Sequence, residues 1–268
     1  MKHYLKSALR PLVCTRVGLK VLSALYNLRK WPPIENETMG APLYNKVVKG
    51  MTVLHGPFKG LKYPGLKSLC STIYPKLLGS YESEISPLVE SLCQKNYSTI
   101  VDIGCAEGYY AIGFALRIPK AQVYAFDTDD EALALCKEMA DLNQTSVKLG
   151  GFCNAKTLEK LDLGPKALII SDCEGYEAYL FSKELAHRLS RHDFLIESHD
   201  CVNIETTRIL REAFADTHTI KEIESVDDIV KAYTYDYPEL ASFSLEDKRN
   251  FLHEGRPGTM RWLYLQPK

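Results

Sequence analysis

The chain has 268 residues, enough for one large α/β domain with additions or for two small domains. Hydrophobic residues make up 46% and charged residues 25%, as in soluble globular proteins, and the net charge of −1 excludes a general attraction to nucleic acid. The eight cysteines form no CxxC pair and several lie in apolar runs, which is typical of buried thiols in a reducing compartment. We therefore expect a cytoplasmic protein without a nucleic-acid partner.

Residues 1–30 form a basic, amphipathic arm. They contain Lys and Arg but no acid, and the interleaved leucines and valines are typical of an amphipathic helix interrupted at Pro11. No apolar run reaches the roughly 18 residues that a membrane span needs. The arm could make peripheral membrane contact, but we favour packing on its own domain or on a second subunit, and the oligomeric state stays open. "KWPPIENE" predicts a linker, so residues 1–37 are interpreted as arm and linker.

Residues 38–98 are predicted to form a cap region that precedes the main domain. The segment is rich in Gly, Pro and Tyr, and "LHGPFKGLKYPG" (54–65) predicts a hairpin. Ser86 and Pro87 suit the start of a helix, because serine can cap a helix and proline fits its first turn. A helix is therefore expected over residues 86–95.

From residue 99 onward, apolar strands alternate with amphipathic helices, which indicates a parallel sheet covered on both faces. We expect residues 99–268 to form a seven-stranded, Rossmann-like α/β domain, with residues 225–258 as an insertion that could cover the acceptor. Inside the insertion, the alternation of Tyr233, Tyr235 and Tyr237 predicts an extended segment with one aromatic face. The predicted strands are 99–103, 122–126, 147–150, 167–171, 193–197, 218–224 and 260–266, and the predicted helices are 108–117, 130–143, 157–161, 176–189 and 204–214.

The segment "TIVDIGCAEGYYAIGFALR" (99–117) has the outline of a nucleotide-binding strand–turn–helix. The dinucleotide fingerprint needs glycines at its first, third and sixth positions. Counted from Gly104, those positions hold Gly104, Ala106 and the bulky Tyr109, and Glu107 stands where a pyrophosphate would approach. The loop therefore favours a ligand without phosphates. Asp127 follows the next strand, where an acid suits the hydroxyls of a ribose.

"VDIGCAEGYY…VYAFDTD" resembles the first two motifs of class I S-adenosylmethionine-dependent methyltransferases. Because their sulfonium donor is cationic, carboxylates near the glycine loop attract it. The resemblance implies S-adenosylmethionine as cofactor and a seven-stranded methyltransferase fold with an N-terminal helical or irregular extension. It also implies that the loop holds the methionine part, that the acid after the second strand holds the ribose, and that a residue after the third strand contacts the adenine. The implied residues are Asp102, Gly104, Cys105, Glu107 and Gly108 in the loop, Asp127 and Thr128 after the second strand, and Asn154.

Residues 50–265 further resemble the FkbM-type methyltransferases, through "PKLLGSYESEI", "DCEGYE" and "FLIESHD". These are mostly O-methyltransferases of sugars and small molecules, so the resemblance implies a sugar or small-molecule acceptor. It also places Tyr81 and Glu82 over the donor pocket. Arg256 in "HEGRPG" is a candidate clamp for an acceptor carboxylate or phosphate, with an ordinary loop arginine as the alternative. The chain lacks the Asn or Asp followed by Pro-Pro-aromatic that amino-adenine methyltransferases have after the fourth strand, which argues against a nucleobase amine as acceptor.

A hydroxyl is a poor nucleophile at neutral pH, so its methylation needs alignment and a base or a metal. His199 follows the fifth strand and is the predicted base, and Asp172 is predicted to orient the acceptor. Asp172, Glu197 and Asp200 could instead ligate magnesium or calcium, although we favour a metal-free site. Alternatively, Glu174 and Glu177 could serve only to cap the next helix.

Two functions remain open at this point. The first is an O-methyltransferase that acts on a hydroxyl of a sugar, glycan precursor or small metabolite. The second is a non-catalytic methyltransferase-like module that its basic arm tethers to a membrane or a complex.

Overall fold

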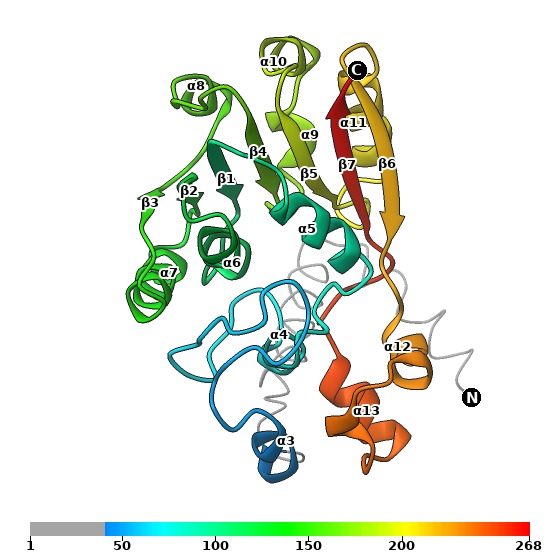
Figure 1. Cartoon of the computed structure of the whole chain (residues 1–268). Coiled ribbons are helices and arrows are strands. Elements are labelled where there is room, and N and C mark those ends of the chain that lie inside the picture. The colour runs from blue at the N-terminus through cyan, green and yellow to red at the C-terminus, as the bar shows by residue number, and fades with distance from the viewer. Residues whose placement is uncertain (1–40) are drawn as a thin grey trace, which may run out of the picture. The chain divides into compact units, whose positions relative to one another are not determined.

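The computed structural model describes residues 41–268, of which Tyr44–Lys268 form one compact unit (Figure 1). The predicted arm and linker at 1–37 lie outside the described residues. Residues 44–98, predicted as a separate cap, belong to the same unit as the sheet. Among the described residues, no helix has the length and apolar character to cross a membrane.

A seven-stranded sheet forms the centre of this unit, in the order β3-β2-β1-β4-β5-β7-β6. Strands β1 to β5 run parallel, whereas β7 lies antiparallel between β5 and β6. β1, β4 and β5 are buried along their whole length, as expected of apolar strands covered on both faces. The predicted seven-stranded Rossmann-like fold is confirmed. The strands are β1 Thr99–Ile103, β2 Gln122–Phe126, β3 Val147–Gly150, β4 Ala167–Ser171, β5 Asp193–Ser198, β6 His218–Glu224 and β7 Arg261–Pro267.

Helices cover both faces of the sheet, with α5 in front and α11 behind in the view of Figure 1. α6 packs on β1 and β2, and α7 packs on β3. α12 and α13 pack on each other within the insertion, and α13 also contacts α4. The helices are α3 Ala41–Val47, α4 Ile73–Leu78, α5 Ser86–Cys93, α6 Tyr109–Arg117, α7 Asp130–Leu142, α8 Ala155–Glu159, α9 Glu177–Leu180, α10 Lys183–Arg188, α11 Thr206–Phe214, α12 Asp228–Thr234 and α13 Leu245–Leu252, with a 3₁₀ helix at Pro238–Leu240.

The buried core lies on both faces of the sheet. On one face, the ring of Phe194 in β5 packs against Phe181 and Phe214, at centroid distances of 5.7 Å and 4.8 Å. On the other, Phe58 packs on α6, where a Cβ atom at Gly113 would lie 2.5 Å from the Phe58 ring. Residue 113 must therefore be glycine for the segment before the sheet to pack this closely on α6.

Two predicted elements differ from the structure. The single helix predicted over 176–189 is divided at Phe181, which ends α9 with non-helical backbone angles, and the extended Ser182 then caps α10 by accepting a hydrogen bond from the Leu185 N–H at 3.2 Å. The hairpin predicted at 54–65 is a chain reversal with one antiparallel bridge, between Thr52 and Lys62. In both cases local chemistry at a turn outweighs the pattern of apolar residues.

The aromatic alternation in the insertion was also interpreted wrongly. Asp227 caps a helix by accepting a hydrogen bond from the Ile229 N–H, and this helix, α12, includes Tyr233. Tyr233 is 70% exposed, whereas Tyr235 and Tyr237 follow the end of the helix. The three tyrosines therefore do not form one aromatic face of an extended segment.

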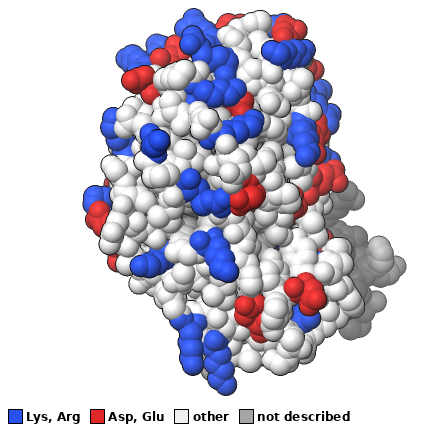
Figure 2. Space-filling view, viewed as in Figure 1, with Lys and Arg blue, Asp and Glu red and all other residues white. Residues whose placement is uncertain are grey.

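Charges are mixed on the face of the molecule that Figure 2 shows, where acidic side chains lie among the basic ones. This distribution agrees with the nearly balanced composition of 33 basic and 34 acidic residues.

Candidate active site

The carboxyl ends of β1, β2, β4 and β5 surround a pocket of about 520 Å³. The strand order reverses between β1 and β4, and ligands of open α/β sheets bind beyond such a reversal. Most of the predicted site residues line this pocket, although their roles there stay predictions. The predicted residues in the lining are Tyr81, Glu82, Asp102, Gly104, Cys105, Asp127, Thr128, Asp172, Glu197 and His199.

The loop after β1 is held against the ends of both neighbouring strands. The backbone N–H groups of Gly104 and Cys105 donate to the Phe126 carbonyl at 2.8 Å and 3.0 Å, and the Ala106 N–H donates to Asp127 Oδ2 at 2.9 Å. Gly104 has a φ of +84°, and a Cβ atom there would lie 1.8 Å from the Asp172 carbonyl oxygen. The loop therefore needs glycine at this position, and Asp127 helps to shape the loop in addition to its predicted role in ribose binding.

Asp102 supplies an unsatisfied negative group to the pocket. Its side chain is buried, and Oδ2 has no hydrogen-bond partner among the described residues. Burial raises the pKa of Asp102 to about 7. A buried carboxylate oxygen without a donor fits a cationic ligand better than an anionic one.

Three residues predicted to contact the cofactor do not line the pocket. Glu107 is buried in an ion pair with Lys76 and accepts a hydrogen bond from the Leu69 N–H at 3.1 Å. Gly108 is the N-terminal cap residue of α6, and Asn154 caps α8 by accepting from the Thr157 N–H at 3.0 Å. The motif match alone could not separate these structural residues from pocket residues, because all of them follow the ends of strands.

Tyr81 and Glu82, from the segment before the sheet, line the pocket, and their place over a donor stays a prediction. The Tyr81 ring packs edge-on against Tyr109 at a centroid distance of 5.4 Å. Glu82 is buried, accepts a hydrogen bond from the Tyr110 hydroxyl and forms an ion pair with Arg256 Nη2 at 2.9 Å. Burial raises the pKa of Glu82 to about 8.

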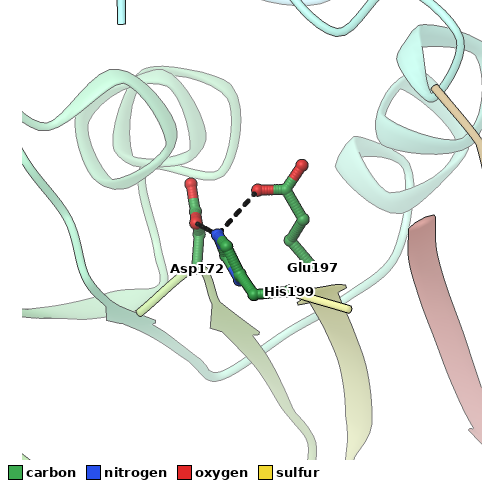
Figure 3. Close-up of side chains that lie close together, drawn as sticks. All are labelled: Asp172, Glu197 and His199. Atoms are coloured by element: carbon green, nitrogen blue, oxygen red, sulfur yellow. Dashed lines mark ion pairs between the residues drawn. The ribbon is translucent and has the colours of Figure 1, made fainter. Parts of the chain in front are cut away.

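The ends of β4 and β5 bring Asp172, Glu197 and His199 together (Figure 3). His199 Nε2 lies 3.5 Å from Asp172 Oδ1 and 3.6 Å from Glu197 Oε2. Glu197 and His199 are two residues apart along an extended chain, so both side chains project to the same side. The side chains of Ser198 and Asp200 have partners outside the cluster. The Ser198 hydroxyl bonds to the Thr207 hydroxyl, and Asp200 accepts a hydrogen bond from the Thr207 N–H at 2.9 Å and pairs with Arg261. Asp200 was therefore wrongly included in the predicted ligand set.

The electrostatics of this cluster change the role expected of His199. Burial alone would lower its pKa, but the neighbouring carboxylates Glu177, Asp172 and Glu197 outweigh burial and raise the pKa to about 9. A proton on the ring argues against His199 as the predicted base, unless a cation displaces that proton from Nε2, and the role of His199 stays a prediction. Burial and neighbouring acids raise the pKa of Asp172 to about 7 and of Glu197 to about 8, so of these three groups Asp172 most readily gains or loses a proton near neutral pH.

Two functional neighbours were missed by sequence reasoning. Glu177 Oε1 lies 2.9 Å from His199 Nδ1 and accepts a hydrogen bond from the Cys173 N–H at 3.0 Å, so it orients the ring as well as the turn. Glu254 from the insertion pairs with Arg256 Nε at 2.9 Å. The motif "DCEGYE" contained a signal for Glu177, but "HEGRPG" indicated only a loop, with Arg256 as a candidate clamp for an anionic group.

Arg256 is not available as such a clamp. Its guanidinium contacts Glu82, Glu197 and Glu254, and it is 13% exposed. These carboxylates hold its pKa above the usual range despite burial. Arg256 therefore neutralises the pocket wall instead of recruiting an acceptor carboxylate.

Comparison with known proteins adds the methyltransferase class. Residues 84–172 match the methyltransferase small domain. Curated relatives include release factor glutamine methyltransferases from Flavobacterium psychrophilum, 32% identical over 109 residues, and from Deinococcus radiodurans, 36% identical over 84 residues. The matches cover 38% and 31% of this chain but only 37% and 29% of those relatives. These matches support the predicted methyltransferase class over residues 84–172, while the activity of the chain and its FkbM-type subfamily stay predictions.

Two of the similar solved structures are methyltransferases by name. A putative O-methyltransferase from Klebsiella pneumoniae is 14% identical with a TM-score of 0.45, over 89% of this chain and 98% of that chain. The precorrin-6y C5,15-methyltransferase from Geobacter metallireducens is 11% identical with a TM-score of 0.44, over 68% of this chain and 88% of that chain. The fold assignment rests on the strand order itself.

Proposed function

We propose that this protein transfers a methyl group from S-adenosylmethionine to a hydroxyl of a sugar, glycan precursor or small metabolite. The observation that carries the proposal is the shared pocket. The glycine loop after β1 and the cluster after β4 and β5 open into the same cavity of about 520 Å³. A donor held at the loop and an acceptor held at the cluster would therefore meet there.

The donor side of the pocket fits a cation that has no phosphate. Asp102 offers a buried oxygen without a partner, and Asp127 lies at the end of β2 within the same lining. When bound, the sulfonium donor supplies an electrophilic methyl group. Asp102 and the loop backbone would hold the amino-acid part, and Asp127 would hold the ribose.

The acceptor side fits an oxygen nucleophile. Transfer to a hydroxyl releases one proton, and Asp172, with a pKa near 7, lies where it could receive that proton. The four residues after β4 are Asp172, Cys173, Glu174 and Gly175, so the Pro-Pro-aromatic motif of amino-adenine methyltransferases is missing from this position. A carboxylate-rich site supports proton removal from oxygen.

Calorimetry with S-adenosylmethionine and S-adenosylhomocysteine tests the donor assignment. Binding of neither compound by a folded sample would overturn it. Transfer of a labelled methyl group to a panel of hydroxylated sugars then tests the acceptor class. A glutamine-containing peptide belongs in the same panel, because the curated relatives are named glutamine methyltransferases. Labelling of that peptide alone would replace the hydroxyl acceptor with an amide.

We also propose cytoplasmic localisation, and residues 1–30 as the segment for any peripheral membrane contact. The support for membrane contact is the run of basic residues without acids in residues 1–30. Co-sedimentation of full-length and arm-deleted protein with anionic liposomes tests the contact. Membrane binding that depends on the arm, combined with donor binding and no transfer to any acceptor, would favour the non-catalytic alternative.

A further inference from the structure

We infer that Asp172, Glu197 and His199 form a binding site for a first-row divalent cation of the manganese or zinc type, which holds the acceptor hydroxyl. The inference rests on the proposed function for the identity of the acceptor, whereas the cation site follows from the side chains alone. One nitrogen and two carboxylate oxygens from these residues lie within 4.8 Å of one another. All three residues line the pocket.

The spacing of the atoms suits a shared ion. Ligand atoms bound about 2.1 Å from one cation lie about 3.0 Å apart at right angles and about 3.4 Å apart in a tetrahedron. His199 Nε2 is 3.5 Å from Asp172 Oδ1 and 3.6 Å from Glu197 Oε2, which is close to these values. The same distances exceed those of good hydrogen bonds.

A buried oxygen that faces the gap lacks a partner. Asp172 Oδ1 is buried and has no hydrogen-bond partner among the described residues. It lies 3.5 Å from Nε2 of His199, whose side chain is only 3% exposed. Buried polar atoms usually have a partner, and an ion in the gap would provide one for Asp172 Oδ1.

Each ligand is oriented by a second residue. Glu177 Oε1 lies 2.9 Å from His199 Nδ1, and Nε2 faces the gap. Arg256 Nη1 contacts Glu197 Oε1, and Oε2 faces His199. A carboxylate behind a histidine is the usual support of a metal-binding imidazole.

The residue types select the ion. An imidazole nitrogen suits zinc, iron and similar metals, whereas carboxylates suit manganese and harder ions, so a mixed set fits first-row divalent cations. With three protein ligands, the ion keeps open positions. A hydroxyl bound there loses its proton more easily, because the cation stabilises the alkoxide.

Methyl transfer to the bound acceptor forms one bond and breaks another. The alkoxide oxygen forms a bond to the methyl carbon while the bond between that carbon and the sulfonium sulfur breaks. The products are a methyl ether and S-adenosylhomocysteine. The hydroxyl proton leaves to a carboxylate or to water.

Mn²⁺ binding to the full-length protein, measured by electron paramagnetic resonance without donor or acceptor, tests the site, with Zn²⁺ as competitor. Asp172→Asn and His199→Gln should each weaken Mn²⁺ binding by about 100-fold, and Glu177→Gln by about 10-fold. Asp200→Asn is the matched control, because this neighbouring acid bonds to Thr207 and Arg261 outside the cluster. Circular dichroism and thermal unfolding confirm that each variant is folded.

Mn²⁺ binding by the variants distinguishes the proposed site from binding elsewhere. Binding that is lost in the cluster variants and kept in Asp200→Asn supports the site. No Mn²⁺ binding to the wild-type protein, or binding that Asp172→Asn and His199→Gln leave unchanged, overturns it. S-adenosylhomocysteine calorimetry without metal tests the donor independently, so failure of the cation site and failure of the proposed function are distinguishable.

Discussion

Gly104→Ala is expected to destabilise the protein and to abolish donor binding. An alanine Cβ atom at this position would lie 1.8 Å from the Asp172 carbonyl oxygen, whereas an unstrained contact needs about 3.2 Å, so the loop must move by more than 1 Å. Such a shift breaks the hydrogen bonds that Gly104 and Cys105 donate to the Phe126 carbonyl, at 2.8 Å and 3.0 Å. Two lost hydrogen bonds cost about 2 kcal/mol, and a non-glycine residue at positive φ adds about 1 kcal/mol.

The total of about 3 kcal/mol should lower the Tm by roughly 6–12 °C for a unit of this size. Differential scanning calorimetry measures this change, and titration with S-adenosylhomocysteine measures the donor affinity, which should fall at least about 100-fold. Gly151→Ala is the control, because Gly151 also lines the pocket but a Cβ atom there meets nothing within 4 Å. A Gly104→Ala protein with unchanged Tm and unchanged donor affinity would refute the loop geometry.

Three further predictions concern His192, Lys231 and Asp127. Burial lowers the pKa of His192 to about 4 in the folded state. The contribution of this histidine to the free energy of unfolding is therefore complete above pH 6.5, and up to about 3 kcal/mol is lost as the pH falls from 6.5 to 4. His192→Asn keeps an acceptor for the Ala167 N–H but does not titrate. The free energy of unfolding in urea should therefore change less between pH 7 and 5 in this variant than in the wild type. An equal pH dependence in the two proteins would contradict this prediction. Lys231→Met should cost about 3–5 kcal/mol in urea unfolding, because buried Glu254 loses one of its two cationic partners, and Glu254→Gln in the same chain should recover part of the loss. Asp127→Asn should weaken S-adenosylhomocysteine binding about 10- to 100-fold with only a small change in Tm, and normal affinity would remove Asp127 from ribose binding.

The sheet was predictable because its strands are short, apolar and separated by amphipathic helices. The boundaries of β1 to β4 agree with the predicted ranges. Burial on both faces demands continuous apolar runs in β1 and β4, whereas β2 is partly exposed and β3 is largely so. The insertion was not predictable in the same way. α12 depends on a cap at Asp227, and α13 depends on a cap at Ser244, both single side-chain hydrogen bonds that composition does not reveal.

The candidate site could likewise be predicted only in part from the sequence. Asp102 lies near the end of β1, and Gly104 and Asp127 directly follow β1 and β2, so their place at the pocket follows from the fold. The state of His199 does not, because it depends on carboxylates from two strands and on Glu177, which lies at the start of a helix. A sequence shows that such residues exist, but their mutual distances, and hence their pKa values, depend on packing between strands.

The extent of the family match has a structural reason. It ends at residue 172, and residues 84–172 contain β1 to β4 with the whole glycine loop. This stretch lines the part of the pocket in which we propose that the donor binds. The part proposed for the acceptor begins at Asp172 and continues through Glu197 in β5, His199 after it and Arg256 in the insertion. The chain therefore shares with its relatives the part that would hold a methyl donor, while the part that would select the acceptor lies beyond the match. The acceptor must therefore be identified by the labelled-acceptor assay. The glutamine in the names of the relatives describes those proteins and does not identify the acceptor of this chain.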